Sequence, residues 1–381
     1  MRFIRNPTED TPCGHTRDAI VRMILARGHR VGDKLPTYRD LAHHLGVAVR
    51  TVARAMSRLS DEGIVQLLHG KGAFVRKMPA GGNRLRTVGL VYPASRLHLV
   101  RTPYLNQILA GIVVQCDVQH IDLQIVAFRQ AGRATYIADR PRDVALRVDG
   151  VLLLEVVNQK YIAEFAKEPV PLVLVDAQSR NSPLPSVCVD NATAVQEVML
   201  HLHDLGHRRI AYVDSPSEDP MSRPGEPRWV DSADGIERRE AYLREVERLG
   251  LDYRHIYRAD DAEILDAARL AAGQIKADRR RPTAVLAYDE PLAGLLCESL
   301  RSLGVSVPET VSVAGAVGVR GTNVAGQLTV TCSIAQFEQM GHLAMQTLVA
   351  QTTDRASSMP VVQRVGSILQ IGTSTATPCE R

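Results

Sequence analysis

Seven short runs of apolar residues recur between residues 87 and 314, and segments with helical periodicity separate them. The runs are residues 87–92, 123–127, 150–154, 172–175, 210–213, 284–287 and 311–314. The helical segments are residues 104–119, 191–205, 235–249, 262–276 and 291–303. Continuous apolar strands occur where helices cover both faces of a parallel sheet. The pattern therefore predicts an α/β fold with doubly wound parallel sheets.

Length and composition restrict the class of protein further. The chain has 381 residues, of which 45% are hydrophobic, and at about 100–200 residues per domain this predicts two or three domains. Apolar runs such as 151–154 are too short to span a membrane, and residues 1–7 lack the apolar stretch of a secretion signal. The six cysteines are scattered without metal-type spacing, which favours a reduced, cytoplasmic chain.

The charge is divided unevenly along the chain. Residues 1–78 hold 14 Lys and Arg against 7 Asp and Glu, whereas the remainder holds 32 against 35. A basic head on a slightly acidic body indicates a small module that binds a polyanion, joined to a domain with another task.

The head contains a short series of expected elements. Helical periodicity covers residues 15–28 and 38–45 and resumes near residue 48, and short strands are expected at 64–68 and 73–75. Thr37 and Asp40 form a partial capping box for the second helix. The order is helix, helix-turn-helix and β-hairpin wing.

This stretch resembles the GntR family of winged helix-turn-helix regulators. It reads KLPTYRDLAHHLGVAVRTVARAMSRLSDEGIVQLLHGKGAFV and matches the family pattern over about 45 residues. Three positions depart from the family's frequent residues, namely Ala48, Val49 and Ala53. The resemblance implies DNA binding through the helix that follows the turn.

The spacing of the arginines supports this interpretation independently. Arg50, Arg54 and Arg58 lie at i, i+4 and i+8, so they share a helix face opposite Val52 and Leu59. Arginine in the major groove hydrogen-bonds guanine O6 and N7. The alternative is that these arginines simply solvate a surface helix.

Four further residues complete the predicted DNA-binding set. Thr51 is expected at a phosphate, and Arg39 at the DNA backbone or a base edge. Lys71 and Gly72 form the wing tip, which lies close to a sugar-phosphate strand in such domains.

Residues 87–375 resemble the LacI-type sensor domain, which has the fold of the periplasmic sugar-binding proteins. The most specific segments are HLHDLGHRRIA and SLGVSVPETVSVAG. A GntR head on such a body resembles the arabinose-responsive repressors of some bacteria. The resemblance implies two α/β lobes joined by three crossovers, with the effector at strand carboxyl ends in the cleft between them.

Three residues match effector-binding positions of that family, namely Tyr104, Arg238 and Asp289. Asp190, in VDN, sits at a crossover and is expected to be structural. The family usually has an acidic pair after the strand VSVAG, but this chain has Ala-Val-Gly at 316–318, which weakens the prediction of a sugar ligand.

Other features carry alternatives. The only tryptophan, Trp229, lies in the long segment 215–234 and could stack on a ligand, although packing is commoner for a single loop Trp. His203 and His207 are spaced as metal ligands. However, Gly206 ends their helix and the segment matches the sequence pattern of the LacI-type sensor domain, so a structural role is favoured. Gly70 and its neighbours lack the context of a phosphate loop.

These observations predict a domain order. Residues 1–78 form the DNA-binding domain, 79–86 a linker and 87–375 the sensor. The first lobe is expected at about 87–187 and 333–355, and the second at about 188–330 and 356–375.

The function predicted is that of a cytoplasmic regulator. A homodimer would bind a palindromic operator and respond to a small polar molecule, with no metal, cofactor or membrane partner. The rival is a GntR-headed pyridoxal-phosphate enzyme, which needs a Schiff-base lysine; the body offers only Lys160, Lys167 and Lys276, none in a matching motif.

Overall fold

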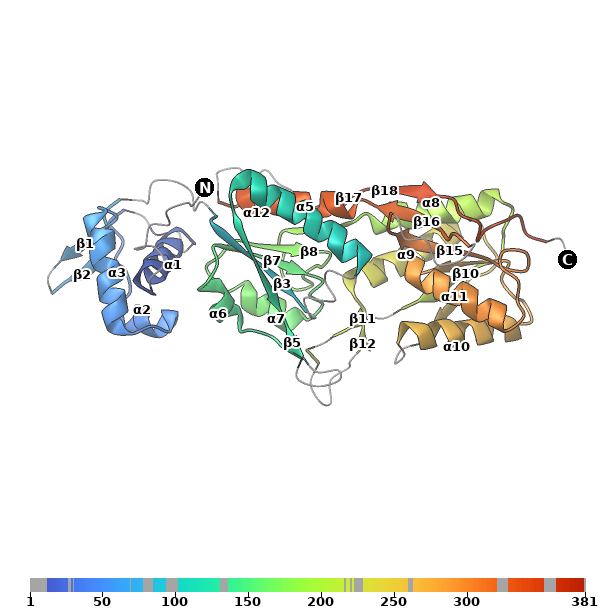
Figure 1. The fold of residues 1–381 in the computed structure, drawn as a ribbon, viewed down its shortest axis with the longest axis horizontal. Coiled ribbons are helices and arrows are strands. Elements are labelled where there is room, and N and C mark those ends of the chain that lie inside the picture. The colour runs from blue at the N-terminus through green and yellow to red at the C-terminus, as the bar shows by residue number, and fades with distance from the viewer. Residues whose placement is uncertain are drawn as a thin grey trace, which may run out of the picture.

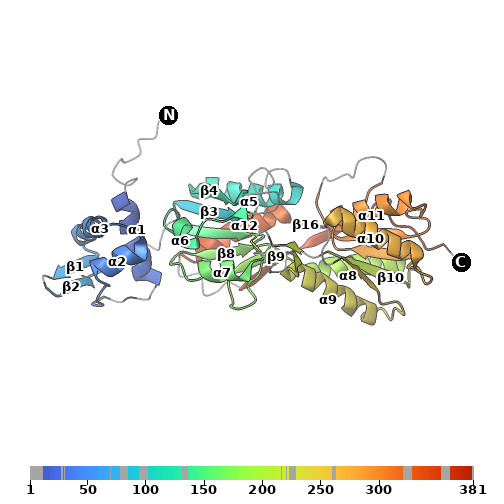
Figure 2. The ribbon, with the colours of Figure 1, turned by 90° about the horizontal axis from the view of Figure 1, so that it is seen from below.

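The computed structural model describes residues 12–26, 29, 31–68, 70–77, 85–93, 102–130, 136–215, 217–219, 221–222, 229–259, 263–320, 328–352 and 361–379. The molecule is elongated (Figures 1 and 2): a small head lies at one end, one α/β lobe in the middle and a second lobe at the other end. Within the described residues, no helix has the length and apolar character needed to cross a membrane.

The head is a winged helix-turn-helix. Its helices are α1 (Pro12–Ala26), α2 (Tyr38–Leu45) and α3 (Val49–Asp61), and its wing is the antiparallel pair β1 (Val65–Leu68) and β2 (Gly72–Val75). Thr37 and Asp40 form the predicted capping box at α2, and Gly46 ends that helix in the left-handed conformation. The inward faces of these elements form a separate hydrophobic core.

The first lobe has a six-stranded parallel sheet in the order β17-β9-β8-β7-β3-β4. Its strands are β3 (Thr87–Tyr92), β4 (Asp122–Ala127), β7 (Gly150–Leu154), β8 (Leu172–Val175), β9 (Ser186–Val189) and β17 (Val362–Val365). Helices α5 (Pro103–Gln119) and α12 (Phe337–Ala350) pack on one face, and α6 (Pro141–Ala145) and α7 (Gln159–Phe165) on the other. A two-stranded pair, β5 (Arg129–Gln130) and β6 (Tyr136–Ile137), lies beside it.

The second lobe has a sheet in the order β13-β10-β14-β15-β16-β18, parallel except for its last strand. Its strands are β10 (Ile210–Asp214), β13 (Ile256–Arg258), β14 (Ala284–Ala287), β15 (Ser312–Gly318), β16 (Thr331–Ala335) and β18 (Ser367–Gln370). Helices α8 (Asn191–Asp204) and α9 (Ala233–Arg248) cover one face, and α10 (Ile264–Ala277) and α11 (Glu290–Ser302) the other. The pair β11 (Ser217–Glu218) and β12 (Trp229–Val230) forms a small ribbon.

The chain passes between the lobes three times, at Asp190, at Gln336 and at Gly366. The predicted lobe boundaries differ from this. Strand β9 extends the first lobe to residue 189, β16 keeps residues 331–335 in the second lobe, and β17 returns residues 362–365 to the first. The physical reason is that a strand belongs to the sheet it pairs with, and pairing between distant strands leaves no local mark in the sequence.

Helices α5 and α12 lie side by side along the first lobe (Figure 1) and approach closely at two glycines. A Cβ atom on Gly111 would lie 1.9 Å from the carbonyl oxygen of Glu338, and one on Gly341 would lie 2.0 Å from that of Ile108. Only glycine at these positions allows the two backbones to be in contact.

Gly111→Ala should therefore lower the free energy of unfolding by about 1–3 kcal/mol or more, the usual cost of overpacking. Gly273→Ala is the matched control, because Gly273 lies in α10 with nothing within 4 Å of an added Cβ; it should raise stability by up to about 1 kcal/mol through helix propensity. Urea denaturation followed by circular dichroism measures both. Equal stability of the two variants would contradict the close approach of the helices.

Candidate functional site

Helix α3 presents arginines to solvent on the head. Val52, Ala55 and Met56 are fully buried, and on the opposite side Arg50 and Arg54 are exposed. This division follows from the apolar periodicity, since burying one face leaves the i, i+4 arginines outside. The helix thus offers guanidinium groups that can enter a DNA groove.

The wing tip is shaped by two glycines. Gly70 and Gly72 have φ values of 71° and 108°, a conformation that favours glycine, and they flank the exposed Lys71. Arg39, in α2, is also exposed, whereas Thr51 is partly buried in the first turn of α3. These residues and the α3 arginines all belong to the head, and whether they contact DNA stays a prediction.

The departure at Ala48 has a structural consequence. Ala48 is the N-cap of α3 and supplies no side-chain hydrogen bond to the helix N-terminus. The Ser or Thr frequent in the GntR family would supply one. The first backbone N–H groups of α3 therefore lack the bond that such a side chain would give.

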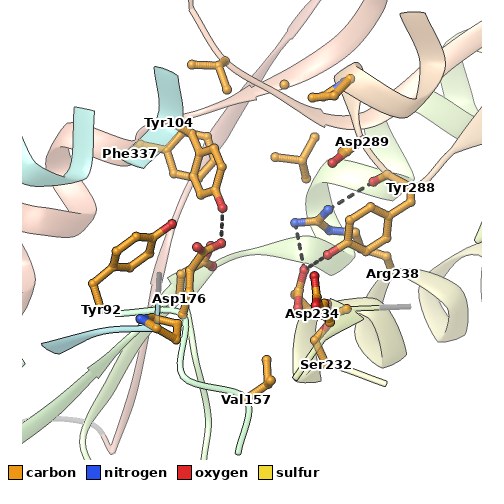
Figure 3. Close-up of a pocket in the computed structure, with 18 residues that line it drawn as sticks. Tyr92, Tyr104, Val157, Asp176, Ser232, Asp234, Arg238, Tyr288, Asp289 and Phe337 are labelled. Carbon is orange, nitrogen blue, oxygen red and sulfur yellow. Dashed lines mark hydrogen bonds and ion pairs between the residues drawn. The ribbon is translucent and has the colours of Figure 1, made fainter. Parts of the chain in front are cut away.

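A cavity of about 410 Å³ lies between the two lobes (Figure 3). It is at the carboxyl ends of strands from both sheets, where parallel α/β sheets hold their ligands. Its described lining comprises Tyr92, Pro93, Tyr104, Glu155, Val157, Asp176, Ser217, Glu218, Ser232, Asp234, Arg238, Tyr288, Asp289, Pro291, Val317, Gly318, Val319 and Phe337.

Arg238 forms the centre of the second-lobe wall. Its Nε donates to Asn191 Oδ1 at 2.8 Å and its Nη1 to the carbonyl oxygen of Tyr288 at 3.1 Å. Its Nη2 lies 3.4 Å from Asp234 Oδ2, and its Cζ lies 4.4 Å from the centroid of the Tyr288 ring. The guanidinium is buried and held in one orientation by these contacts.

Asp289 lies on the same wall (Figure 3) and also caps a helix. It is the N-cap of α11, because its Oδ1 accepts a hydrogen bond of 2.8 Å from the Leu292 N–H. Burial raises the pKa of its carboxyl to about 6, although the bond from Leu292 and the nearby Arg238 oppose the shift.

The first-lobe wall is made of carboxylates and aromatic rings. Glu155 and Asp176 directly follow the adjacent strands β7 and β8, and both have left-handed backbone, with φ values of 53° and 49°. The Tyr104 hydroxyl donates a hydrogen bond to Glu155, and the Tyr104 ring lies 5.4 Å from that of Phe337.

Both carboxyl groups resist ionisation in this wall. Burial, and then the neighbouring Asp176, raise the pKa of Glu155 to about 8, against the opposing effect of the Tyr104 hydrogen bond. Burial and Asp234 likewise raise the pKa of Asp176. This wall therefore holds two carboxyl groups whose ionised forms water stabilises poorly.

The missing acidic pair has a steric explanation. A Cβ on Gly318 would lie 2.3 Å from Cys332 Sγ and 2.9 Å from Glu290 Oε2. Glu290 is buried and its Oε2 accepts a 2.9 Å hydrogen bond from the Val319 N–H. Position 318 thus has no room for a carboxylate side chain, and the cavity takes its acids from other strands.

The structure brings together all three predicted effector residues, since Tyr104, Arg238 and Asp289 line one cavity. Sequence reasoning missed Glu155, Asp176 and the other lining residues. Their position immediately after predicted parallel strands was the available signal.

Two further predictions concern structural residues. Asp190 accepts a hydrogen bond from the Thr193 N–H as N-cap of α8. His207 bonds the hydroxyl of Thr283 at 3.0 Å and the carbonyl oxygen of Ala376 at 2.9 Å, so it ties the C-terminal segment to the second lobe. Both residues hold structure, as the sequence indicated.

Trp229 does not belong to the described cavity lining. It lies partly buried on β12, paired with Glu218 of β11. The ribbon contributes Ser217 and Glu218 to the cavity instead. Of the predicted linker, residues 79–86, positions 79–84 lie outside the described residues.

Two family models match the chain. Residues 14–75 match the bacterial regulatory proteins of the gntR family, and residues 199–375 match a periplasmic binding protein-like domain.

Individual relatives and a solved structure are similar to larger parts of the chain. Catabolite control protein A of Priestia megaterium is 25% identical over 57% of this chain, and the match spans 62% of that relative, less than two thirds of its length. The arabinose metabolism transcriptional repressor of Geobacillus stearothermophilus is 23% identical over 78% of this chain and 80% of its own. The structure of the transcriptional regulator CelR in complex with cellobiose shares the fold, with a TM-score of 0.61 at 21% identity, covering 89% of this chain and all of that one.

The raised pKa of Glu155 predicts a pH dependence of stability. An acid whose pKa is higher in the folded than in the unfolded protein makes stability fall as pH rises, here between about 5 and 8. Glu155→Gln keeps an acceptor for Tyr104 and removes the charge, so the fall should become shallower. Melting temperatures from pH 5 to pH 9 measure this, with Glu247→Gln, an exposed change on α9, as the control. The same slope in wild type and Glu155→Gln would contradict the burial of this charge.

Proposed function

We propose that this chain, which joins a winged helix-turn-helix domain of the gntR family to a periplasmic-binding-protein-like domain, is a transcription regulator controlled by a small molecule. The observation that carries the proposal is the presence in one chain of an exposed arginine helix and a polar cavity between two lobes. We expect repression, by analogy with the relative named as a transcriptional repressor of arabinose metabolism, and we propose that the effector relieves it.

The DNA-binding step depends on α3. Arg50 and Arg54 have the fork of donors that reads guanine in the major groove, and Lys71 supplies a charge for the phosphate backbone. Arg39, Thr51 and Gly72 complete the proposed contact surface. A homodimer would place two such helices on the half-sites of a palindromic operator, in the cytoplasm, where bacterial DNA lies.

The sensing step depends on the cavity. We assign Tyr104, Arg238 and Asp289 to effector binding, with a sugar or sugar derivative as the general ligand class. Its size suits the proposal, because pockets for small molecules commonly have about 300–1,000 Å³. An effector that weakens DNA binding must itself bind the DNA complex more weakly, because the coupling is reciprocal.

A pyridoxal-phosphate enzyme is the less favoured candidate. No lysine occurs among the described cavity-lining residues. Lys276 donates to the carbonyl oxygen of Leu303, and Lys160 and Lys167 are exposed on the first lobe. These positions do not suit a Schiff base in the cavity.

Arg54→Ala should weaken binding to the cognate operator by about 1–3 kcal/mol and relax base preference at one position in each half-site. Fluorescence anisotropy on operator variants at fixed salt measures this. Arg269→Ala, an exposed arginine of α10 in the far lobe, is the control and should bind as wild type. Wild-type affinity in Arg54→Ala would remove this residue from the proposed contact surface.

Arg238→Ala and Asp289→Asn should raise the effector concentration needed to change operator binding by about tenfold or more, equivalent to about 1.4 kcal/mol. Asparagine preserves the N-cap of α11, so the second variant isolates the charge. Operator titrations with and without a compound found by thermal-shift screening provide the readout. Arg244→Ala, exposed on α9, is the control. An unchanged response in both cavity variants would mean that the effector binds elsewhere.

A further inference from the structure

We infer that the compound held in the interlobe cavity carries a protonated amine, and that this ammonium group lies against Glu155 and Asp176 of the first lobe. The inference rests on the proposed function, in which the cavity is the effector site. It narrows the ligand class from polar compounds in general to small organic amines.

The charges that line the cavity are unbalanced. Its described lining contains five carboxyl groups, from Glu155, Asp176, Glu218, Asp234 and Asp289, and the guanidinium of Arg238 as its one cation. That guanidinium already has Asp234 at 3.4 Å. Glu155 and Asp176 form no ion pair with the described residues, and a neutral or anionic ligand would bring no cation to stabilise their ionised forms.

No cation among the described residues contacts the first-lobe pair, although the charge of Arg238 acts on Asp176 from the opposite wall. The Glu155 N–H donates to the Val175 carbonyl oxygen at 3.0 Å, so the two acidic residues leave neighbouring strands side by side. Among the described residues, Glu155 has the Tyr104 hydroxyl as its side-chain donor, and the Asp176 carboxyl receives no hydrogen bond. The two adjacent carboxyl groups thus receive one hydrogen bond, from a neutral hydroxyl. They can accept further hydrogen bonds from a group with several N–H donors.

Aromatic rings complete the proposed ammonium site. Figure 3 shows Tyr92, Tyr104 and Phe337 on the same side of the cavity as Asp176. Ring faces attract cations, and the attraction grows when water is excluded. An ammonium therefore finds both charge and π-surface at this wall, whereas a hydroxyl group of the same size would use only the acceptors.

The opposite wall indicates the rest of the ligand. Arg238 and Asp289 face the cavity from the second lobe, and Ser232 lies near them (Figure 3). These side chains can hydrogen-bond hydroxyl groups, or another polar group, at the other end of the ligand. A compound with an amine at one end and such groups at the other would contact both lobes, as an amino sugar does.

The raised pKa values agree with this arrangement. Burial raises the pKa of Glu155 to about 8, so ionisation there is unfavourable without a counter-charge. A bound ammonium supplies the charge and should lower this pKa. Binding of an amine should therefore release protons from the first-lobe wall near neutral pH.

The test uses the full chain and matched ligand pairs that differ in an amine or a hydroxyl. The pairs are D-glucosamine with D-glucose, D-galactosamine with D-galactose, and tyramine with 4-(2-hydroxyethyl)phenol. Isothermal titration calorimetry should find at least one amine that binds about tenfold or more tightly than its hydroxyl partner. Repeating that titration in buffers of different ionisation enthalpy should detect the released protons.

Three variants test whether the ammonium group of the ligand binds at the first-lobe wall. Glu155→Gln and Asp176→Asn should each weaken the bound amine by about tenfold or more and leave the affinity of its hydroxyl partner nearly unchanged. Glu247→Gln should change neither affinity. Circular dichroism shows whether each variant is folded. If only one of the two first-lobe variants folds, that variant alone is enough for the test.

The outcomes separate this inference from the proposed function. It is overturned if no amine of the panel binds, if the hydroxyl compounds bind as tightly as the amines, or if the variants weaken both members of a pair equally. Operator affinity is measured in the same samples. An amine that binds selectively but leaves operator affinity unchanged would support the inference and contradict the proposed regulation.

Discussion

Glu237 of α9 holds the two lobes together at the crossings. Its carboxylate accepts hydrogen bonds from Arg364 at 2.5 and 2.6 Å, from Asn191 at 2.8 Å and from Gln178 at 2.9 Å. Arg364 and Gln178 belong to the first lobe, whereas Glu237 and Asn191 belong to the second. Burial alone would raise the pKa of Glu237, but the bonds from its three partners hold it below its ordinary value. The relative position of the lobes, and hence the shape of the cavity, depends on this network.

The same network reaches the cavity through one amide. Asn191 donates to Glu237 and accepts from Arg238 Nε at 2.8 Å, so the cavity guanidinium and the interlobe carboxylate share a partner. A ligand that shifts Arg238 must change the geometry of Asn191 and so the bonds at the crossing. Under the proposed function this contiguous path gives a physical route from ligand to lobe angle, provided that the ligand binds one arrangement more tightly than the other.

Local patterns predicted seven strands and five helices of the two lobes and three cavity residues. They did not predict the buried strands β9 and β16 or the helices α6, α7 and α12. Continuous apolar runs such as 150–154 coincide with the strands because both faces of the sheets are buried. Strands β17 and β18 were not predicted, since β17 pairs with a strand far away in sequence and exposed residues interrupt both runs. Glu155 and Asp176 were missed for a related reason: only the pairing of β7 with β8 makes two carboxylates, 21 positions apart, neighbours.

Under the proposed function, the position of the head bears on how a dimer would regulate DNA binding. Arg142 of α6 donates to the His43 carbonyl oxygen at 2.7 Å, and Leu146 packs against the core of the head, so both contacts come from the first lobe. In the proposed mechanism, closing the cavity would move the second lobe relative to the first, and the head would stay with the first lobe. We therefore propose that operator affinity would change through the distance and angle between the two heads of a dimer. Such a change would follow if the two first lobes shift relative to each other when the lobes of each subunit close.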